Sequence, residues 1–206
     1  MKPIIVFIDD SKFEHELVAG EIAPAAPEFY FVQTYTFDEA RKALGQRRPA
    51  LFLLDLWGQD PEVKTPFLTP KDELERKIAA FPTLEHVYGG LDEFRGDVNN
   101  EYLKRLFSIV DRWRSLFESV CARVGQNRRY GLDNLNGVRT YYPAVPAVFY
   151  TRKSLINDAV AMIHAGADGV FIKPTGADDG ETRRLTRAYA PTLAAGLAGI
   201  MEKGGA

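Results

Sequence analysis

Four continuous apolar runs constrain the fold of this chain more than any other feature. They are Ile4–Ile8, Leu51–Leu56, Ala147–Thr151 and Gly169–Lys173. Each has the length of a strand, and none alternates regularly between apolar and polar residues, which is typical of parallel strands covered by helices on both faces. A fifth run, Phe29–Gln33, is expected to lie nearer an edge of the sheet.

Helix-start signals follow these runs. Ser11 and Glu14 have the spacing of a capping box, in which a hydroxyl and a carboxylate three residues later satisfy two backbone amides. Thr36 and Glu39 repeat that spacing, and a further helix is predicted over about 181–202. The alternation of strands and helices predicts an α/β fold with a doubly wound, five-stranded parallel sheet and right-handed crossovers.

One connection is too long for a single crossover. Asp55 and Thr151 lie 96 positions apart, whereas a helical crossover needs about a dozen residues. We therefore predict a single domain over 1–206, whose core is formed by 1–56 and 144–206 and which carries a helical insertion at 57–143.

Two helices are predicted within this insertion. A short one follows Thr69 as its cap, and a long one covers about 99–125. The apolar residues of the long helix recur at steps of three and four, which is a heptad pattern. We expect this apolar side to face a core rather than to form a free coiled coil.

Composition excludes several classes of protein. The net charge is −2 and the single cysteine is Cys121, so direct nucleic-acid binding by bulk charge and an internal disulfide are not expected. No apolar run approaches the roughly 18 residues of a membrane span, and the apolar N-terminus is too short for a signal peptide. These features favour a cytoplasmic protein without membrane attachment.

Chemically versatile residues gather where the predicted strands end. Asp9 and Asp10 follow the first strand, Asp55 ends the third, and Thr151 and Lys173 end the last two. Ligands of open α/β sheets bind at the carboxyl ends of the strands. Carboxylates in this number suit Mg²⁺, and a carboxylate can also act as a nucleophile toward phosphorus. Lys173 could neutralise a phosphoryl group.

Four stretches in this order, IIVFIDDS, LFLLDL, AVFYTRKS and AGADGVFIKP, resemble the receiver domain of bacterial two-component response regulators. The resemblance covers roughly 1–56 and 144–206. It implies a stand-alone receiver with the flavodoxin-like strand order 2-1-3-4-5 and a large helical insertion between the third and fourth strands.

The resemblance also implies a metal site. Asp10 matches the family's direct Mg²⁺ ligand, Asp9 its neighbour, and Asp55 a further ligand. The backbone carbonyl of Trp57 falls where the family supplies another ligand. The implied cofactor is Mg²⁺.

The remaining implied roles concern a phosphoryl group. Asp55 matches the phosphoacceptor, Thr151 the hydroxyl that moves toward the phosphoryl group, and Lys173 the lysine that pairs with it. Pro174 matches a proline that often follows a cis bond in the family.

Three departures from the family pattern bear on signalling. In the loop after Asp55, the usual methionine-proline turn and the glycine after it are not in register, so the loop is rebuilt. Arg152 stands where a small residue is preferred; we expect it to be solvated, with hindrance of the donor or contact with the phosphoryl group as alternatives. Val170 replaces the usual switch aromatic, and Phe171 follows it.

The function that the resemblance implies is that of a phosphoacceptor in a phosphorelay. A histidine kinase or phosphotransfer protein would phosphorylate Asp55, and the product would modulate binding to a downstream protein through the 57–143 insertion. The protein would not be an enzyme beyond self-phosphotransfer and slow self-dephosphorylation. A homodimer is an open possibility.

Three alternatives remain open. The chain could be a pseudo-receiver, a module for interaction or dimerisation that works without phosphorylation. It could be a Schiff-base aldolase that uses Lys173, although such enzymes are eight-unit barrels. An aspartate-nucleophile phosphatase is a weaker alternative, because its second aspartate is expected two residues after the nucleophile, where Trp57 stands.

Overall fold

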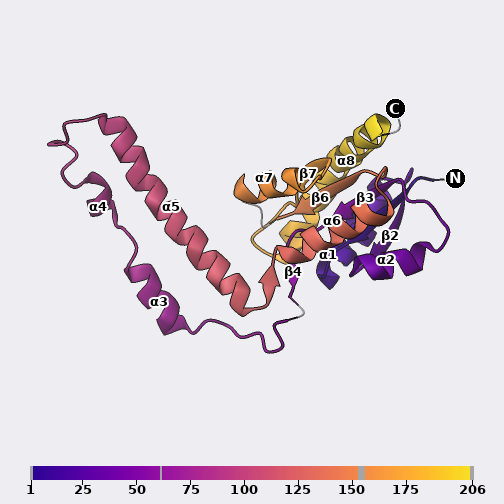
Figure 1. Cartoon of the computed structure of the whole chain (residues 1–206), viewed down its shortest axis with the longest axis horizontal. Coiled ribbons are helices and arrows are strands. Elements are labelled where there is room, and N and C mark those ends of the chain that lie inside the picture. The colour runs from indigo at the N-terminus through magenta and orange to yellow at the C-terminus, as the bar shows by residue number, and fades with distance from the viewer. Residues whose placement is uncertain (1, 61, 153–155, 205–206) are drawn as a thin grey trace. The chain divides into compact units, whose positions relative to one another are not determined.

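The computed structural model describes residues 2–60, 62–152 and 156–204. The chain divides into two compact units (Figure 1). The first unit comprises 1–60 and 127–206, and the second comprises 61–126.

The first unit is built on a parallel sheet of five strands, which confirms the predicted fold class. The strand order β2-β1-β3-β6-β7 is the predicted order 2-1-3-4-5, with all neighbouring pairs parallel. The strands are β1 (Ile4–Ile8), β2 (Tyr30–Thr34), β3 (Leu51–Leu54), β6 (Ala147–Thr151) and β7 (Gly169–Ile172).

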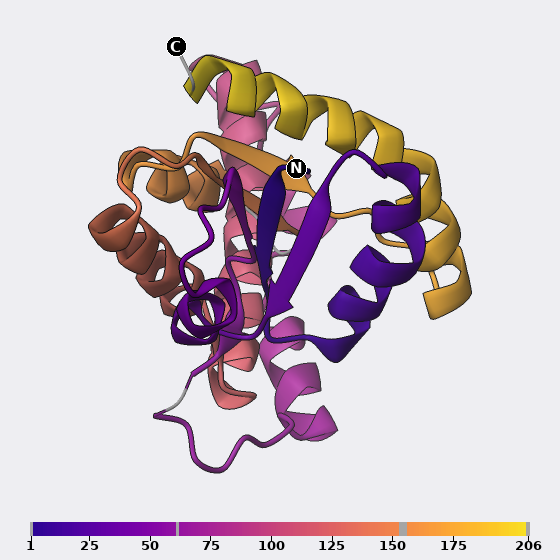
Figure 2. The same cartoon turned by 90° about the vertical axis from the view of Figure 1, so that its right-hand side faces the viewer.

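Helices cover both faces of this sheet. Figure 2 shows α1 and α8 on one side and α2, α6 and α7 on the other. The helices are α1 (Lys12–Leu17), α2 (Phe37–Leu44), α6 (Arg129–Tyr141), α7 (Ile156–His164) and α8 (Asp179–Gly204); the π-helix η1 (Val18–Ile22) and the 3₁₀ helix η2 (Ala23–Ala25) follow α1.

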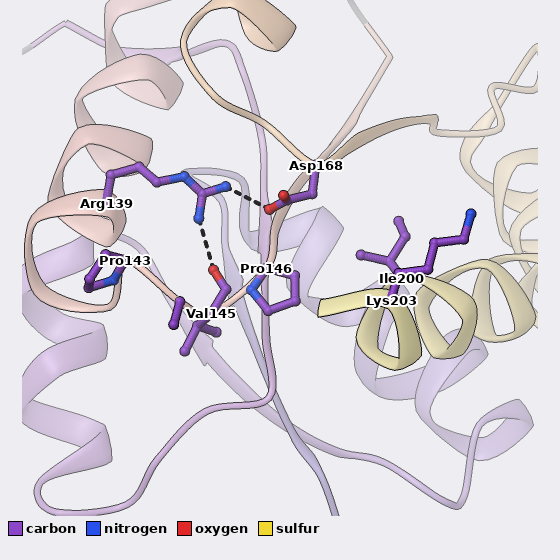
Figure 3. A pocket seen from close by; sticks show the side chains of 8 residues that line it. Arg139, Pro143, Val145, Pro146, Asp168, Ile200 and Lys203 are labelled. Atoms are coloured by element: carbon purple, nitrogen blue, oxygen red, sulfur yellow. Dashed lines mark hydrogen bonds and ion pairs between the residues drawn. The ribbon is translucent and has the colours of Figure 1, made fainter. Parts of the chain in front are cut away.

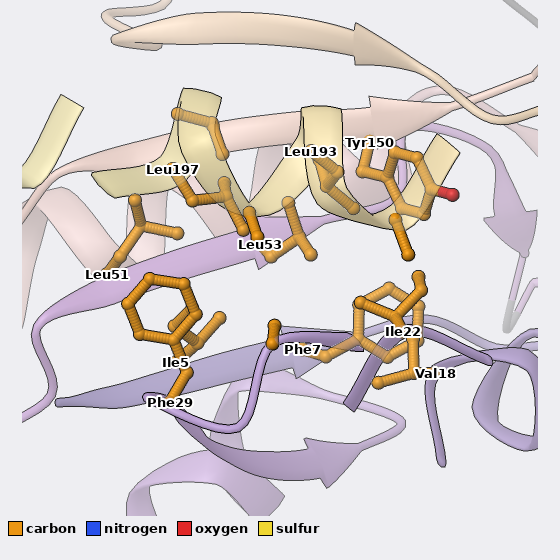
Figure 4. Close-up of a cluster of buried hydrophobic side chains, with 14 residues drawn as sticks. Ile5, Phe7, Val18, Ile22, Phe29, Leu51, Leu53, Tyr150, Leu193 and Leu197 are labelled. Atoms are coloured by element: carbon orange, nitrogen blue, oxygen red, sulfur yellow. The ribbon is translucent and has the colours of Figure 1, made fainter. Parts of the chain in front are cut away.

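The two-residue period of the strands divides the core between the two faces. Side chains at one set of alternate positions pack beneath α8 and η1 (Figure 4). They include Ile5, Phe7, Leu51, Leu53, Val148 and Tyr150, with Leu193 and Leu197 from α8. On the other face Phe52 packs against Phe37 of α2, with ring centroids 6.1 Å apart. Because both faces are buried, the strands need the continuous apolar runs seen in the sequence.

The helix α6 is the crossover that returns the chain from β3 to β6. It was included in the 57–143 insertion of the sequence analysis, but the structure assigns residues from 127 onward to the first unit. Gly131 allows α6 to pack closely on the segment after β3, where its backbone amide donates to the Leu56 carbonyl at 3.0 Å. A Cβ atom at Gly131 would lie 2.4 Å from the carbonyl oxygen of Asp55.

The second unit contains α3 (Lys71–Ala79), α4 (Leu84–Tyr88) and α5 (Val98–Arg123). The predicted cap at Thr69 is wrong, because Pro70 occupies the N-cap of α3. The expectation that the heptad side of α5 faces a core is also wrong: Leu103, Val110 and Trp113 are 50%, 59% and 49% exposed. The helices α3 and α4 are too short to cover a helix of 26 residues. Among the described residues, no helix is long and apolar enough to cross a membrane.

The points where the chain leaves and re-enters the first unit are adjacent. The side-chain amide of Asn127 donates a hydrogen bond to the carboxylate of Asp60. Just beside these residues, β4 (Gly58–Gln59) and β5 (Gln126–Asn127) form a two-stranded sheet. The second unit is thus attached to the first through two neighbouring strands.

Gly131→Ala tests the packing of α6 on the end of β3. We expect the free energy of unfolding to fall by about 1–3 kcal/mol, the usual cost of overpacking, because the new methyl group meets backbone atoms. Gly199→Ala in α8 is the matched control, since no atom lies within 4 Å of its added Cβ; it should gain about 0.5–1 kcal/mol. Urea unfolding of both variants measures the difference, and equal stabilities would contradict this packing.

Candidate functional site

Strand register brings three ionisable residues of the sequence-predicted site to one face of the sheet. Asp9 continues the alternation of Ile5 and Phe7, and Asp55 that of Leu51 and Leu53. The pairing of Ile8 with Leu54 then sets Asp9 and Asp55 side by side. Lys173 follows Ile172, which pairs with Thr151.

The ammonium of Lys173 lies among carboxylates. Its Nζ atom is 2.5 Å from Asp9 Oδ2 and 3.1 Å from Asp55 Oδ1. The side chains of Lys173, Asp9 and Asp55 are 3%, 1% and 11% exposed. A charge so deeply buried requires compensation, and Lys173 provides it for both acids.

Burial and neighbouring charges shift the pKa values of this pair. Burial raises the pKa of Asp9 from 3.8 to about 7, with Lys173 opposing the shift and Asp55 adding to it. Burial by itself would lower the pKa of Lys173, but the carboxylates of Asp55, Asp9 and Glu14 outweigh it and hold that pKa above its ordinary value. Lys173 is therefore a fixed ammonium ion at neutral pH.

Three carboxylates of the site could hold a cation. Ligand oxygens of Asp9, Asp10 and Asp55 all lie within 4.8 Å of one another. Two opposite ligands of Mg²⁺ at 2.1 Å would be about 4.2 Å apart, so a small closure would bring the three carboxylates within coordination distance of one ion. Asp10 is oriented by the Gln59 amide, which donates to its Oδ2 atom at 2.8 Å. The donor set fits a hard divalent cation.

Thr151 also lies at this edge of the sheet. It is fully buried, and its hydroxyl oxygen has no hydrogen-bond partner among the described residues. An unpaired buried hydroxyl costs about 1–3 kcal/mol, so the site holds a donor that a ligand could satisfy. The metal role of the Trp57 carbonyl stays a prediction. The cis bond implied at Pro174 is not found, since the described residues contain no cis peptide.

The sequence analysis missed Glu14 as a site residue. Ser11 Oγ does accept from the Glu14 amide at 3.4 Å, as expected for a cap. The Glu14 carboxylate does not complete the box, because the Ser11 amide is already bound by Asp9 Oδ1 at 2.8 Å. It turns to Lys173 instead, at 3.6 Å from Nζ, and forms an ion pair with Arg152. Arg152 was expected to be solvated; its pairing with Glu14 corrects this.

Tyr130 at the start of α6 is a second residue that sequence reasoning missed. Its hydroxyl donates to the Tyr35 carbonyl at 2.6 Å, and a Cβ at Gly58 would lie 2.4 Å from its ring. Burial, then Asp9, Asp10 and Asp55, raise its pKa. Tyr130 thus packs beside the acidic cluster, and only glycine at position 58 leaves room for its ring.

The resemblance to receiver domains implies a switch aromatic at position 170. Val170 occupies its position, and the neighbouring Phe171 packs against the buried cluster under α8. A Cβ at Gly196 of α8 would lie 2.6 Å from the Phe171 ring. Phe171 is therefore a core residue, and it does not replace the missing aromatic.

A separate cavity of about 330 Å³ lies at the opposite edge of the sheet. Figure 3 shows Arg139 within it, directed at Asp168 and at the Val145 carbonyl. Arg139 also donates to the Gly166 carbonyl. Its guanidinium thus fastens α6 to the starts of β6 and β7, which gives this residue a structural role.

No protein-family model and no curated protein matches the chain. The solved structures that it resembles include receiver domains, the family indicated by the sequence motifs. The signal receiver domain of a Vibrio parahaemolyticus protein named as a LuxO repressor has 13% identity and a TM-score of 0.49, with 99% of this chain and 93% of that chain covered. A CheY-like receiver domain protein from Methanospirillum hungatei has 12% identity and a TM-score of 0.46, with 98% and 99% covered.

NtrX from Brucella abortus is a third similar protein. Its receiver domain has 18% identity and a TM-score of 0.43, with 91% of this chain and 98% of that domain covered. Only 28% of a longer NtrX chain is covered. Similarity at this level decides nothing about function.

Asp9→Asn tests the electrostatics of the site. Because the pKa of Asp9 is raised, the folded protein retains between about pH 4 and pH 7 a proton that the unfolded chain releases, and its stability falls as the pH rises through this range. We expect Asp9→Asn to remove that fall in stability. At pH 8 without divalent cations, its free energy of unfolding should exceed that of the wild type by about 1 kcal/mol or more. Urea unfolding across this pH range measures it, with the exposed-site variant Asp38→Asn as control; parallel curves for wild type and Asp9→Asn would contradict the raised pKa.

Proposed function

We propose that this chain is a receiver-type signalling protein that accepts a phosphoryl group on Asp55 in a Mg²⁺-dependent reaction. The observation that carries the proposal is the position of Lys173, which is fixed as an ammonium ion 3.1 Å from the Asp55 carboxylate. The unpartnered hydroxyl of Thr151 supports it, because it is a free donor at the same sheet edge.

The transfer requires one nucleophilic substitution at phosphorus. A carboxylate oxygen of Asp55 donates an electron pair to the phosphorus atom and forms a P–O bond. The bond to the donor breaks, P–N for a phosphohistidine or P–O for an acyl phosphate, and the leaving group keeps its electron pair. No redox change occurs. Lys173 and Thr151 would donate hydrogen bonds to the phosphoryl oxygens, where negative charge is concentrated.

Asp9, Asp10 and Asp55 would hold the Mg²⁺ ion, and the Trp57 carbonyl is proposed as a further ligand. A bound Mg²⁺ would neutralise charge on the carboxylates and the phosphoryl oxygens. The charges of the site agree with this cation: four carboxylates, those of Asp9, Asp10, Glu14 and Asp55, face two side-chain cations. A divalent ion would balance the remainder.

The alternatives are weaker. A Schiff-base role for Lys173 needs a neutral amine, whereas its carboxylate neighbours raise its pKa. One observation favours a pseudo-receiver: the Glu14 carboxylate forms ion pairs with Lys173 and Arg152, the cations that a phosphoryl group on Asp55 would need. It predicts that a partner binds wild type and Asp55→Asn equally well.

We further propose that the second unit contributes the surface for a downstream protein. One side of α5 carries apolar side chains that stay more than a third exposed; these are Leu103, Phe107, Val110, Trp113 and Phe117. Exposed apolar patches of this kind commonly mark protein interaction sites. The phosphoryl donor would be a histidine kinase or phosphotransfer protein, acting in the cytoplasm.

Asp55→Asn tests the proposed phosphorylation directly. Wild type incubated with acetyl phosphate should be labelled only when Mg²⁺ is present, and Asp55→Asn should show no label, because an amide oxygen is a poor nucleophile toward phosphorus. Intact-mass measurement and peptide mapping identify the site. Asp38→Asn, which changes an exposed carboxylate, should be labelled like wild type. Absence of label and of any Mg²⁺ response in the wild type would leave the pseudo-receiver as the better account.

Removal of the second unit tests whether the first unit alone accepts the phosphoryl group and whether the second unit binds the downstream protein. A chain in which a short glycine-serine loop replaces 61–126 should fold and accept label on Asp55, because Asp60 and Asn127 are adjacent. It should lose binding to any downstream partner captured by the full chain. The measurements are the labelling rate, expected to stay close to that of the wild type because every candidate site residue lies in the first unit, and partner binding. Retention of full partner binding would refute the surface role of the second unit.

A further inference from the structure

Glu14 contacts both side-chain cations at the phosphoacceptor edge. One carboxylate oxygen lies 3.6 Å from Lys173 Nζ, and the other forms the ion pair with Arg152. The Glu14 side chain is 8% exposed. A carboxylate buried to this degree is held by its cations, since an unpaired buried charge is costly.

Arg152 is only partly committed to this pair. Its side chain is 26% exposed, and the contact with Glu14 is made through one terminal nitrogen. The Nε–H group is buried and has no hydrogen-bond partner among the described residues. A guanidinium presents five donors in a fork that matches phosphate oxygens, so Arg152 has donors to offer a second anion.

A phosphoryl group on Asp55 would change the balance around Glu14. It replaces a carboxylate of charge −1 by a group of charge close to −2, with three strong acceptor oxygens. The new charge would arise beside Lys173, which Asp55 already contacts at 3.1 Å against 3.6 Å for Glu14. The phosphoryl group and Glu14 would then compete for the same cations.

We propose that Glu14 is an internal competitor of the phosphoryl group: it occupies Lys173 and Arg152 in the unphosphorylated protein, and phosphorylation of Asp55 draws both cations away from it. Arg152, one residue after Thr151, is thereby a second phosphoryl-binding cation, which pairs with Glu14 until Asp55 is phosphorylated. This inference rests on the proposed function of Asp55, and it assigns to α1, which carries Glu14, the first response to phosphorylation.

Beryllofluoride in the presence of Mg²⁺ is the probe, because it mimics a phosphoryl group without a covalent step. Calorimetric titration of the full chain measures its affinity for wild type, Glu14→Gln, Arg152→Gln and the double variant. We expect Glu14→Gln to bind about tenfold more tightly, the size of one charge-assisted hydrogen bond. Arg152→Gln should bind beryllofluoride several-fold more weakly than the wild type, and Arg152→Lys should recover part of that affinity. The double variant should lose most of the affinity gained by Glu14→Gln alone.

Glu16→Gln is the matched control. Glu16 lies on the same helix and pairs with Arg183 at 2.8 Å, but it is 47% exposed. It undergoes the same change of charge and should leave beryllofluoride affinity unchanged. If Glu14→Gln fails to fold, Glu14→Asp withdraws the carboxylate by one methylene while keeping its charge, and the same tightening is expected in smaller measure.

The outcomes separate this inference from the proposed function. A wild type that binds no beryllofluoride overturns both. A wild type that binds it, with Glu14→Gln and Arg152→Gln unchanged, overturns the competition and leaves Asp55 as phosphoacceptor. A gain in Glu14→Gln that survives in full in the double variant overturns the role of Arg152.

Discussion

The buried ammonium of Lys173 is the interaction on which the acidic site at the carboxyl ends of the strands depends. Without it, Asp9 and Asp55 would be two nearly buried carboxylates side by side, which repel each other and would take up protons. With it, the contacts at 2.5 and 3.1 Å fix the ends of β1 and β3 to the loop after β7. The same ion also explains why Glu14 leaves its capping position, since a carboxylate gains more from a buried cation than from a helix-end amide.

Much of the fold could be predicted from the sequence because buried parallel strands have a distinctive pattern. The continuous apolar runs gave the five strands, and their order along the chain restricted the topology to a doubly wound sheet. The proximity of the candidate residues Asp9, Asp10, Asp55, Thr151 and Lys173 could be predicted for the same reason: each lies at or just after the end of a strand, and the ends of parallel strands share one edge.

What could not be predicted depends on tertiary contacts. Glu14 has the spacing of a capping residue, and nothing local reveals that Lys173 and Arg152 compete for its carboxylate. The boundary of the second unit was misjudged because α6 contains Gly131 and Gly137, which weaken a helix pattern; both glycines are explained only by close contacts, with the Asp55 backbone and the Phe37 ring. The exposed side of α5 was assigned to a core because periodicity indicates an apolar face but not what covers it.

The adjacency of Asp60 and Asn127 has a consequence for how the chain folds. The pairing of β3 with β6 joins segments separated by most of the second unit and by α6, and closing a flexible loop becomes more costly as the loop grows. A second unit that has already folded holds its two ends together, since the Phe67 amide donates to the Arg123 carbonyl at 3.0 Å, and so removes most of its 66 residues (61–126) from that loop. By the logarithmic dependence of closure entropy on loop length, this saves about 1 kcal/mol. Early folding of the second unit would thus shorten the loop between β3 and β6 and speed the pairing of these strands.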